Sequence, residues 1–303
     1  MSRIEIVKGL SNNAYHNGYK EYISSTTLKK YIESNMQFKH EVSLPKVDKP
    51  HFAFGSFWHD LISSKHPKGE SIEESYAIVD YPDYMLNKGK PYGPTSQAYI
   101  EGFNRMRAAH DGKAIIFPEQ YEQAKAMVDG IFTPIWKHPS EKAFKALFEK
   151  GEPEVSYFIN DFVPDVNIKF RPDLDGSNYF LDYKTTSESI SNFTKTILNF
   201  GYDISAGMYH EGKQESNREL YGEDIETKMY WLVQCTNPPY DWAIFSAERI
   251  MPIGIQKFYT LLERHNYSKS TGQYPGIAHF ANAKHGIFTP EFAPWQTKLN
   301  NLI

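Results

Sequence analysis

An acidic and a basic side chain share one face of a short β-like run, YFLDYK at 179–184. Side chains in a strand point alternately to its two faces, so Asp182 and Lys184 are neighbours, about 7 Å apart along the strand. Asp173 lies upstream, where the preceding predicted strand closes. A hairpin register between the two strands would bring Asp173 beside Asp182.

A third carboxylate, Glu154, begins the predicted strand before these two. Carboxylate oxygens converging at one sheet edge suit Mg²⁺, with Mn²⁺ as a substitute, and a bound cation would offset their mutual repulsion. Lys184 could then orient or activate an attacking water, or stabilise a phosphorane-like transition state. The group therefore predicts metal-assisted hydrolysis of a phosphodiester, although an acid beside a lysine is also what a solvated ion pair looks like.

The elements that must position these residues alternate between helical and β-rich patterns. Periodicity and turn residues predict helices at 22–40, 52–64, 118–138, 191–201, 205–213 and from 250 onward, and strands at 154–159, 166–171, 179–184, 229–235 and 241–247. The first three strands form a predicted antiparallel meander. The order of elements predicts an α/β (α+β) fold with one mixed central β-sheet flanked by helices.

The whole chain, 1–303, is predicted to be a single domain. Residues 80–117 combine turn formers with basic and aromatic side chains and are expected to form a mobile, partly helical excursion. Residues 266–303 are expected to form a C-terminal extension.

Composition narrows the class of protein. Apolar residues make up 40% and charged residues 23%, as in ordinary globular domains, and the formal net charge is −4. A single cysteine, Cys235, excludes a disulfide framework and a multi-cysteine zinc or iron–sulfur site, and is expected to be a buried small apolar residue. Neither a membrane-spanning run nor a secretory signal is found, so a cytoplasmic protein with no membrane partner is predicted.

The run Arg171-Pro172-Asp173 followed by Asp182-Tyr183-Lys184-Thr185-Thr186 resembles the core of PD-(D/E)XK nucleases, which have a restriction-endonuclease-like fold. More narrowly, the chain resembles the RecE-type (exodeoxyribonuclease VIII-like) exonucleases of phages and prophages over about residues 15–265. The further segments that carry the resemblance are Tyr22-Ile23-Ser24-Ser25, Gly55-Ser56-Phe57-Trp58-His59, Glu154-Val155-Ser156 and Pro238-Pro239-Tyr240.

The resemblance implies roles for individual residues. Asp173 and Asp182 would be metal ligands, with the backbone carbonyl of Tyr183 as a third. His59 and Glu154 would complete or support the metal shell. The catalytic set would consist of Lys184, Asp182, Asp173, Glu154 and, on the substrate side, Tyr209.

The resemblance also implies an activity and its partners. We expect a Mg²⁺-dependent 5′→3′ exonuclease that acts on ends of linear double-stranded DNA and leaves 3′ single-stranded tails for recombination. Relatives form homo-oligomeric rings, trimers or tetramers, and a single-strand annealing recombinase is an expected partner that would use the tails. A ring focuses a few basic residues into one channel and therefore needs no strongly basic chain. The expected location is the cytoplasm of a bacterial host cell.

Several positions leave alternatives open. Glu152 could replace Glu154 if the register differs, and Asp175 competes with Asp173, which is preferred because it directly follows Arg-Pro. Ser205 stands where the family has a glutamine, and serine is too short for the same reach to DNA. A DNA-end-binding or partner-binding protein with little or no cleavage, or an endonuclease of the same fold, therefore stays open.

The remaining predicted DNA contacts are weaker. They include Thr185, directly after the motif, and Ser205. Four basic residues could instead be solvent-facing: Arg171 and Lys169 on their strand, and Arg105 and Arg107 in the 80–117 segment. Gln234 occupies a strand position where relatives often carry glutamate. Phe57 and Trp58 are expected to be core residues, and His59 would also be a core residue without the family pattern.

Overall fold

The structure is a computed structural model, and it describes residues 3–44, 50–134, 136–280 and 287. The chain divides into two compact units, Met1–Ser25 with Lys46–Phe258, and Thr26–Pro45 with Tyr259–Ile303. The first unit holds the β-sheets and every predicted site residue. The single domain expected for 1–303 remains a prediction.

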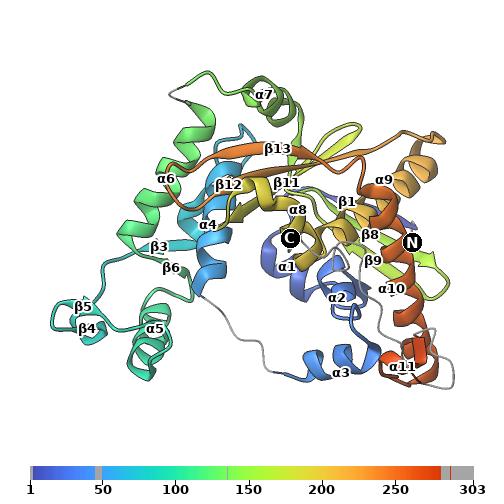
Figure 1. Ribbon diagram of the computed structural model, residues 1–303, viewed down its shortest axis with the longest axis horizontal. Helices are drawn as coiled ribbons and strands as arrows, with labels where there is room; N and C mark the ends of the chain where they lie inside the picture. The colour runs from blue at the N-terminus through green and yellow to red at the C-terminus, as the bar shows by residue number, and fades with distance from the viewer. Residues whose placement is uncertain (1–2, 45–49, 135, 281–286, 288–303) are drawn as a thin grey trace, which may run out of the picture. The chain divides into compact units, whose positions relative to one another are not determined.

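A five-stranded mixed sheet forms the centre of the first unit (Figure 1). Its order is β13-β12-β11-β10-β7, and only β11 and β12 pair in parallel. The strands are β7 (Glu152–Pro153), β10 (Leu174–Asp175), β11 (Tyr179–Thr186), β12 (Lys228–Cys235) and β13 (Trp242–Ser246). The mixed α/β class is the one predicted, and the strands expected at 179–184, 229–235 and 241–247 are confirmed.

One face of this sheet is covered by α4 (Pro50–Ser63), α6 (Pro118–Phe132) and α7 (Glu141–Lys150). Tyr179, Leu181 and Tyr183 of β11 enter the core on this side. Phe57 and Trp58 are buried there too, as predicted. The predicted alternation along β11 therefore holds, because its apolar odd positions pack against helices.

Helices α8 (Phe193–Phe200) and α9 (Tyr202–Tyr221) cover the opposite face. The ring of Phe193 packs edge-on against Trp231, and that of Phe180 against Tyr209. Residues 205–213, predicted as a separate helix, form the middle of the longer α9. Helix α10 (Met251–Thr271) follows β13.

A second sheet, of order β1-β8-β9-β2, corrects the predicted meander. It contains β1 (Ile4–Val7), β2 (Tyr22–Ile23), β8 (Ser156–Val163) and β9 (Val166–Phe170). β8 and β9 pair in antiparallel fashion, but β9 does not continue onto β11. Pro172 lacks the backbone N–H that a longer ladder would need, and the chain passes through β10 first.

The helix predicted over 22–40 was wrong as one element. It divides into β2, α2 (Ser25–Lys29) and α3 (Asn35–Ser43), and α1 (Asn12–Asn17) precedes them. The side chain of Ser34 caps α3 by accepting a hydrogen bond from the Gln37 N–H, so a new helix starts there. In the second unit, Asn35 of α3 donates to the Arg264 carbonyl and to Ser268.

The 80–117 segment is partly helical, as predicted, and has its own small core. Its elements are η2 (Asp83–Met85), β4 (Leu86–Asn87), β5 (Lys90–Pro91), α5 (Gln97–Ala109) and β6 (Ala114–Ile116), which pairs with β3 (Tyr76–Ile78) after η1 (Ile72–Glu74). Five buried apolar side chains join them: Met85, Tyr99, Met106, Ile115 and Phe117.

Two further predictions concern the chain's surface and end. The expected C-terminal extension begins within α10 and includes α11 (Ile277–Phe280), and its remainder lies outside the described residues apart from position 287. Cys235 ends β12 and is partly buried, so the predicted burial is only partial. Within the described part of the chain, no helix has the length and apolar character needed to cross a membrane.

Candidate metal and catalytic site

Strands β10 and β11 place two carboxylates side by side. Leu174 pairs with Leu181 and Asp175 with Phe180, so the same register continued by one residue sets Asp173 opposite Asp182. Asp173 also accepts a hydrogen bond from the backbone N–H of Tyr183. The two aspartates are thus held by backbone geometry at the edge where β10 begins.

Lys184 contacts this pair directly. Its Nζ lies 2.6 Å from Oδ2 of Asp182 and donates to the Tyr183 carbonyl at 3.1 Å. Burial, followed by the charge of Asp173, raises the pKa of Asp182 to about 6 even though Lys184 acts against it. Burial alone would lower the pKa of Lys184, but Asp182 and Asp173 outweigh it and raise that pKa above its usual range.

His59 of α4 reaches the same group from the neighbouring layer. Its Nε2 lies 2.7 Å from Oδ1 of Asp173, and its Nδ1 lies 2.9 Å from Oδ1 of Asp60. Tyr76 donates to the other Asp60 oxygen at 2.7 Å. Burial opposes charge on both His59 and Asp173, but their mutual attraction prevails. The pKa of His59 is raised and that of Asp173, which Lys184 also contacts electrostatically, is lowered.

Gln234 positions α4 against the sheet. Its Oε1 accepts from Trp58 Nε1 at 2.8 Å, and its Nε2 donates to the carbonyls of Met127 at 2.8 Å and Tyr240 at 3.0 Å. A glutamate could not donate to two carbonyls. Gln234 stands where relatives often carry glutamate, and its neighbours here form hydrogen bonds that need a side-chain amide.

Glu154 lies between β7 and β8, because β8 begins at Ser156 and not at 154 as predicted. Its backbone is left-handed, with φ 51°, a conformation that costs a non-glycine residue about 1 kcal/mol or more. The Glu154 N–H donates to the Asp173 carbonyl at 3.2 Å. Burial raises the pKa of its carboxyl group, with Arg171 acting against this.

His59, Asp60 and Glu154 each offer one ligand atom, and these three atoms lie within 4.8 Å of one another. Sequence reasoning missed Asp60 and Tyr76. The only sequence signal for Asp60 was its place directly after His59 on a helix. Nothing local pointed to Tyr76, since only the tertiary fold brings β3 against α4.

The structure separates the competing carboxylates. Glu152 forms an ion pair with Lys68 at 2.5 Å, whereas Asp175 pairs with Lys213 at 2.6 Å. Both alternatives therefore have partners outside the group formed by Asp173, Asp182, Lys184, His59, Asp60 and Glu154, which we call the central cluster.

Lys169 and Arg171 are directed into the protein. Lys169 is 6% exposed, and its ammonium donates to the carbonyls of Tyr15 and Tyr19 at 2.8 Å each. Arg171 donates to the Leu10 carbonyl at 3.0 Å, and its guanidinium lies over the Tyr15 ring. Both side chains hold the N-terminal segment, and the contact with DNA phosphates expected of them stays a prediction.

Ser205 and Tyr209 lie beside the cluster on α9. Ser205 is buried and donates to the hydroxyl of Ser25 at 3.2 Å. The Tyr209 ring stacks on Phe170, and its hydroxyl donates to the Arg171 carbonyl at 3.5 Å. Both side chains thus make internal contacts, whereas the sequence predicted contacts with substrate.

The other three predicted DNA contacts lie on β11 and α5. Thr185 is half-buried on β11, directly after Lys184. Arg105 and Arg107 belong to α5, where the Arg105 guanidinium lies 4.5 Å from the Tyr84 ring centroid. The two arginines thus accompany the small core of the 80–117 segment and not the central cluster.

Comparison with known proteins decides the family. The model of the PDDEXK-like domain of unknown function (DUF3799) matches residues 24–283. The chain belongs to this family. Among curated proteins, no sequence matches it.

A solved structure supports the same fold. It is that of a "putative exonuclease" from Eubacterium rectale, which aligns with a TM-score of 0.53 at 11% identity. The alignment covers 97% of this chain and 100% of the other. At this identity the likeness concerns the fold, and it agrees with a restriction-endonuclease-like PDDEXK domain.

Proposed function

We propose that this PDDEXK-like chain is a metal-dependent deoxyribonuclease that degrades linear double-stranded DNA from its 5′ ends and leaves 3′ tails. The observation that supports it best is the pairing of Asp173 and Asp182 at one strand edge. Lys184 and His59 contact these carboxylates at 2.6 and 2.7 Å. Such a combination of acids, one lysine and one imidazole suits phosphodiester hydrolysis.

The donor atoms fit Mg²⁺ or Mn²⁺. Carboxylate oxygens and a backbone carbonyl are hard ligands, and imidazole is acceptable to Mn²⁺. Asp173 and Asp182 would hold the ion, with His59, Asp60, Glu154 and the Tyr183 carbonyl completing or supporting its shell. The raised pKa of Asp182 fits this assignment, because burial and a second carboxylate disfavour its charge until a cation is near. When bound, the ion would supply Lewis-acid stabilisation of the phosphate and a more acidic water.

The protein's own groups have separate tasks. Lys184 brings a positive charge to the scissile phosphate or to the attacking water, which it can orient by hydrogen bonding. The series Tyr76–Asp60–His59 fixes one oxygen of Asp173, and the Tyr183 N–H fixes the other. The Asp173 carboxylate therefore needs little reorganisation to act as a ligand.

The finer parts of the proposal rest on the RecE-type resemblance. They are 5′→3′ polarity, a trimeric or tetrameric ring around DNA, a single-strand annealing recombinase as partner, and a phage or prophage origin in a bacterial cytoplasm. The order of the sequence segments supports them, and the exonuclease name of the Eubacterium rectale protein supports action at DNA ends alone. The mild net charge of −4 is compatible with a ring that focuses its basic residues in a channel.

Digestion of linear duplex labelled at the 5′ or the 3′ end, with and without Mg²⁺, tests the proposal. We expect Mg²⁺-dependent early loss of the 5′ label, sparing of closed circles, and no digestion by Asp182→Ala. Glu223→Ala, which alters an exposed carboxylate, serves as the matched control and should digest normally.

Other outcomes would redirect the proposal. Cleavage of circles would favour an endonuclease, and early loss of the 3′ label would reverse the polarity. Absence of cleavage in Mg²⁺ and in Mn²⁺ would favour a protein that only binds DNA ends. The main reason for that last alternative was Ser205, whose hydroxyl donates to that of Ser25.

A further inference from the structure

The C-terminal end of α8 exposes two large apolar side chains. Phe200 is 61% exposed and Leu198 is 58% exposed. The opposite face of this helix is buried through Phe193 and Ile197. Lys195 is also exposed and lies three residues before Leu198, so the two side chains are neighbours on the helix surface.

Single exposed apolar residues are common, but this pair is connected to the central cluster. The Phe200 and Tyr202 rings are stacked, with centroids 5.7 Å apart and planes inclined by 20°. The Tyr202 ring centroid lies 5.2 Å from Nζ of Lys184. Only two side-chain contacts therefore separate the exposed Phe200 ring from the lysine.

The backbone between the two rings is specialised. Gly201 ends α8 and precedes α9 with φ 60°, in the left-handed region that a side chain disfavours. This turn brings rings two residues apart into a stack. An aromatic surface with a lysine on the same helix matches the way proteins hold single-stranded nucleic acid, by base stacking beside a backbone-directed cation.

We propose that Lys195, Leu198, Phe200 and Tyr202, the α8 platform, bind an unpaired nucleobase of the DNA strand whose phosphodiester reaches Lys184. The inference rests on the proposed function and adds to it the class of ligand. Every base has a π-face, so the platform accepts all four bases. The ligand is then a frayed or tailed duplex end and not an intact base pair.

Binding without cleavage provides the test. A duplex with a short single-stranded tail carrying 2-aminopurine is titrated with Asp182→Asn protein in the presence of a chelator, and fluorescence and affinity are recorded. We expect quenching by stacking on the unaltered platform. In the same background, Phe200→Ala should abolish the quenching and weaken binding about 5- to 100-fold, and Phe200→Trp should retain both.

The same helix pair offers a matched control. Tyr221 is 67% exposed at the far end of α9, about 28 Å along the helix from Tyr202 by its rise per residue. Tyr221→Ala should bind and quench as the background protein does. Because Phe200 and Tyr221 are both exposed, neither substitution should lower the melting temperature.

Two results would overturn the inference. One is unchanged quenching and affinity in Phe200→Ala. The other is a lower oligomer mass in sedimentation for Phe200→Ala with unchanged DNA binding, which would make the platform a contact between copies of this chain. Failure of the proposed function is recognised separately, as absence of Mg²⁺-dependent digestion by the unaltered protein.

Discussion

Two lysines in the first unit, Lys213 and Lys184, form ion pairs with aspartates of the 173–182 stretch. The charges around Lys213 are balanced, whereas those around Lys184 are not. Lys213 of α9 donates to Asp175 and to the hydroxyl of Tyr157, each at 2.6 Å. Tyr157 in turn donates to the second Asp175 oxygen. One acid, one base and one hydroxyl thus form a closed set, which we call the Lys213 triad.

The central cluster, only two residues away along β10, is not balanced in this way. Its four carboxylates, on Asp60, Glu154, Asp173 and Asp182, have Lys184 and His59 as cationic partners, and Arg171 lies 3.9 Å from Glu154. A buried group intended only to stabilise a fold is expected to pair each charge. The excess of acid supports the proposed metal site.

The largest expected effect separates the two neighbouring aspartates. Asp173→Asn should reduce Mg²⁺-dependent cleavage at least about 1000-fold, because it removes a proposed ligand charge. Asp175→Asn should lower the melting temperature and leave cleavage by the folded protein within a few-fold. Initial rates on a labelled duplex, combined with thermal melts, provide the measurement. Equal loss of cleavage in both variants would contradict the distinction.

The Lys213 triad should contribute more to stability than to chemistry. Lys213→Met leaves Asp175 buried without its cation and should cost about 3–5 kcal/mol in the free energy of unfolding. Joint replacement by Asp175→Leu, Tyr157→Phe and Lys213→Met should recover much of that loss, because no polar group is then left unpaired. Urea titration measures both. If the single variant is as stable as the unaltered protein, the triad has no structural role.

The central cluster should make the metal-free protein sensitive to pH. The pKa of Asp182 is about 6 in the folded state against 3.8 ordinarily, so the folded state binds this proton more tightly between the two values. Its contribution to the free energy of unfolding should therefore fall by about 1–3 kcal/mol as the pH rises from about 4 to about 6. Chelator-treated protein melted across this range should show the decline, and Asp182→Asn should flatten it. Saturating Mg²⁺ should also reduce the change of stability with pH. If Asp182→Asn showed the same change as the unaltered protein, the pH dependence would not arise from Asp182.

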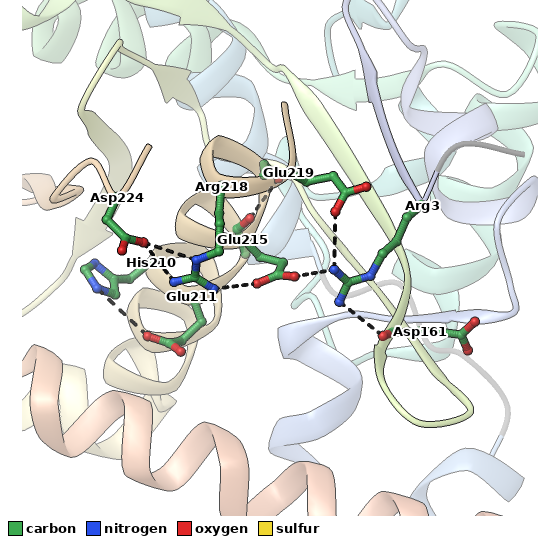
Figure 2. Close-up of polar contacts among 10 residues, drawn as sticks. Arg3, Asp161, His210, Glu211, Glu215, Arg218, Glu219 and Asp224 are labelled. Atoms are coloured by element: carbon green, nitrogen blue, oxygen red, sulfur yellow. Dashed lines mark hydrogen bonds and ion pairs between the residues drawn. The ribbon is translucent and has the colours of Figure 1, made fainter. Parts of the chain in front are cut away.

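A surface network gives the smallest expected effect. Arg3 forms ion pairs with Glu215 and Glu219 of α9, and Arg218 contacts Glu215 and Asp224 (Figure 2). Arg3 is 37% exposed at its side chain, so Arg3→Ala should cost no more than about 1 kcal/mol. The loss should shrink further in high salt. Urea titration measures the change in the free energy of unfolding. If Arg3→Ala lost as much as Lys213→Met, burial would not explain the difference between the surface network and the Lys213 triad.

Local patterns anticipated much of the first unit. The helices at 52–64 and 118–138 and the strands of the parallel pair were predicted, because long periodic runs reveal which face of an element is buried. The 22–40 helix failed because Tyr22 and Ile23 pair with β9, a contact that no local window contains. The meander failed for a related reason, since the pairing partners of β9 and β11 were chosen by packing between distant segments.

The candidate site was predictable in part. Asp182 and Lys184 could be placed together because strand alternation is a property of the backbone itself. Lys169 and Arg171 could not be assigned a direction, since their partners are backbone carbonyls in the segment around Leu10 to Tyr19. Asp60 was missed because the function of a carboxylate on a helix cannot be inferred before its neighbours in the fold are known.

The sequence by itself determined the kind of chemistry available, the family of the chain and the sharing of one strand face by Asp182 and Lys184. The available chemistry follows from residue types, the family from the match over residues 24–283, and the shared strand face from the alternation of side chains along the backbone. Only the tertiary structure decided that Asp173, and not Asp175, belongs with Asp182, and that His59 and Asp60 join them from α4. The physical reason is that a carboxylate's role depends on which charges lie within a few ångströms, and packing between distant elements sets those distances.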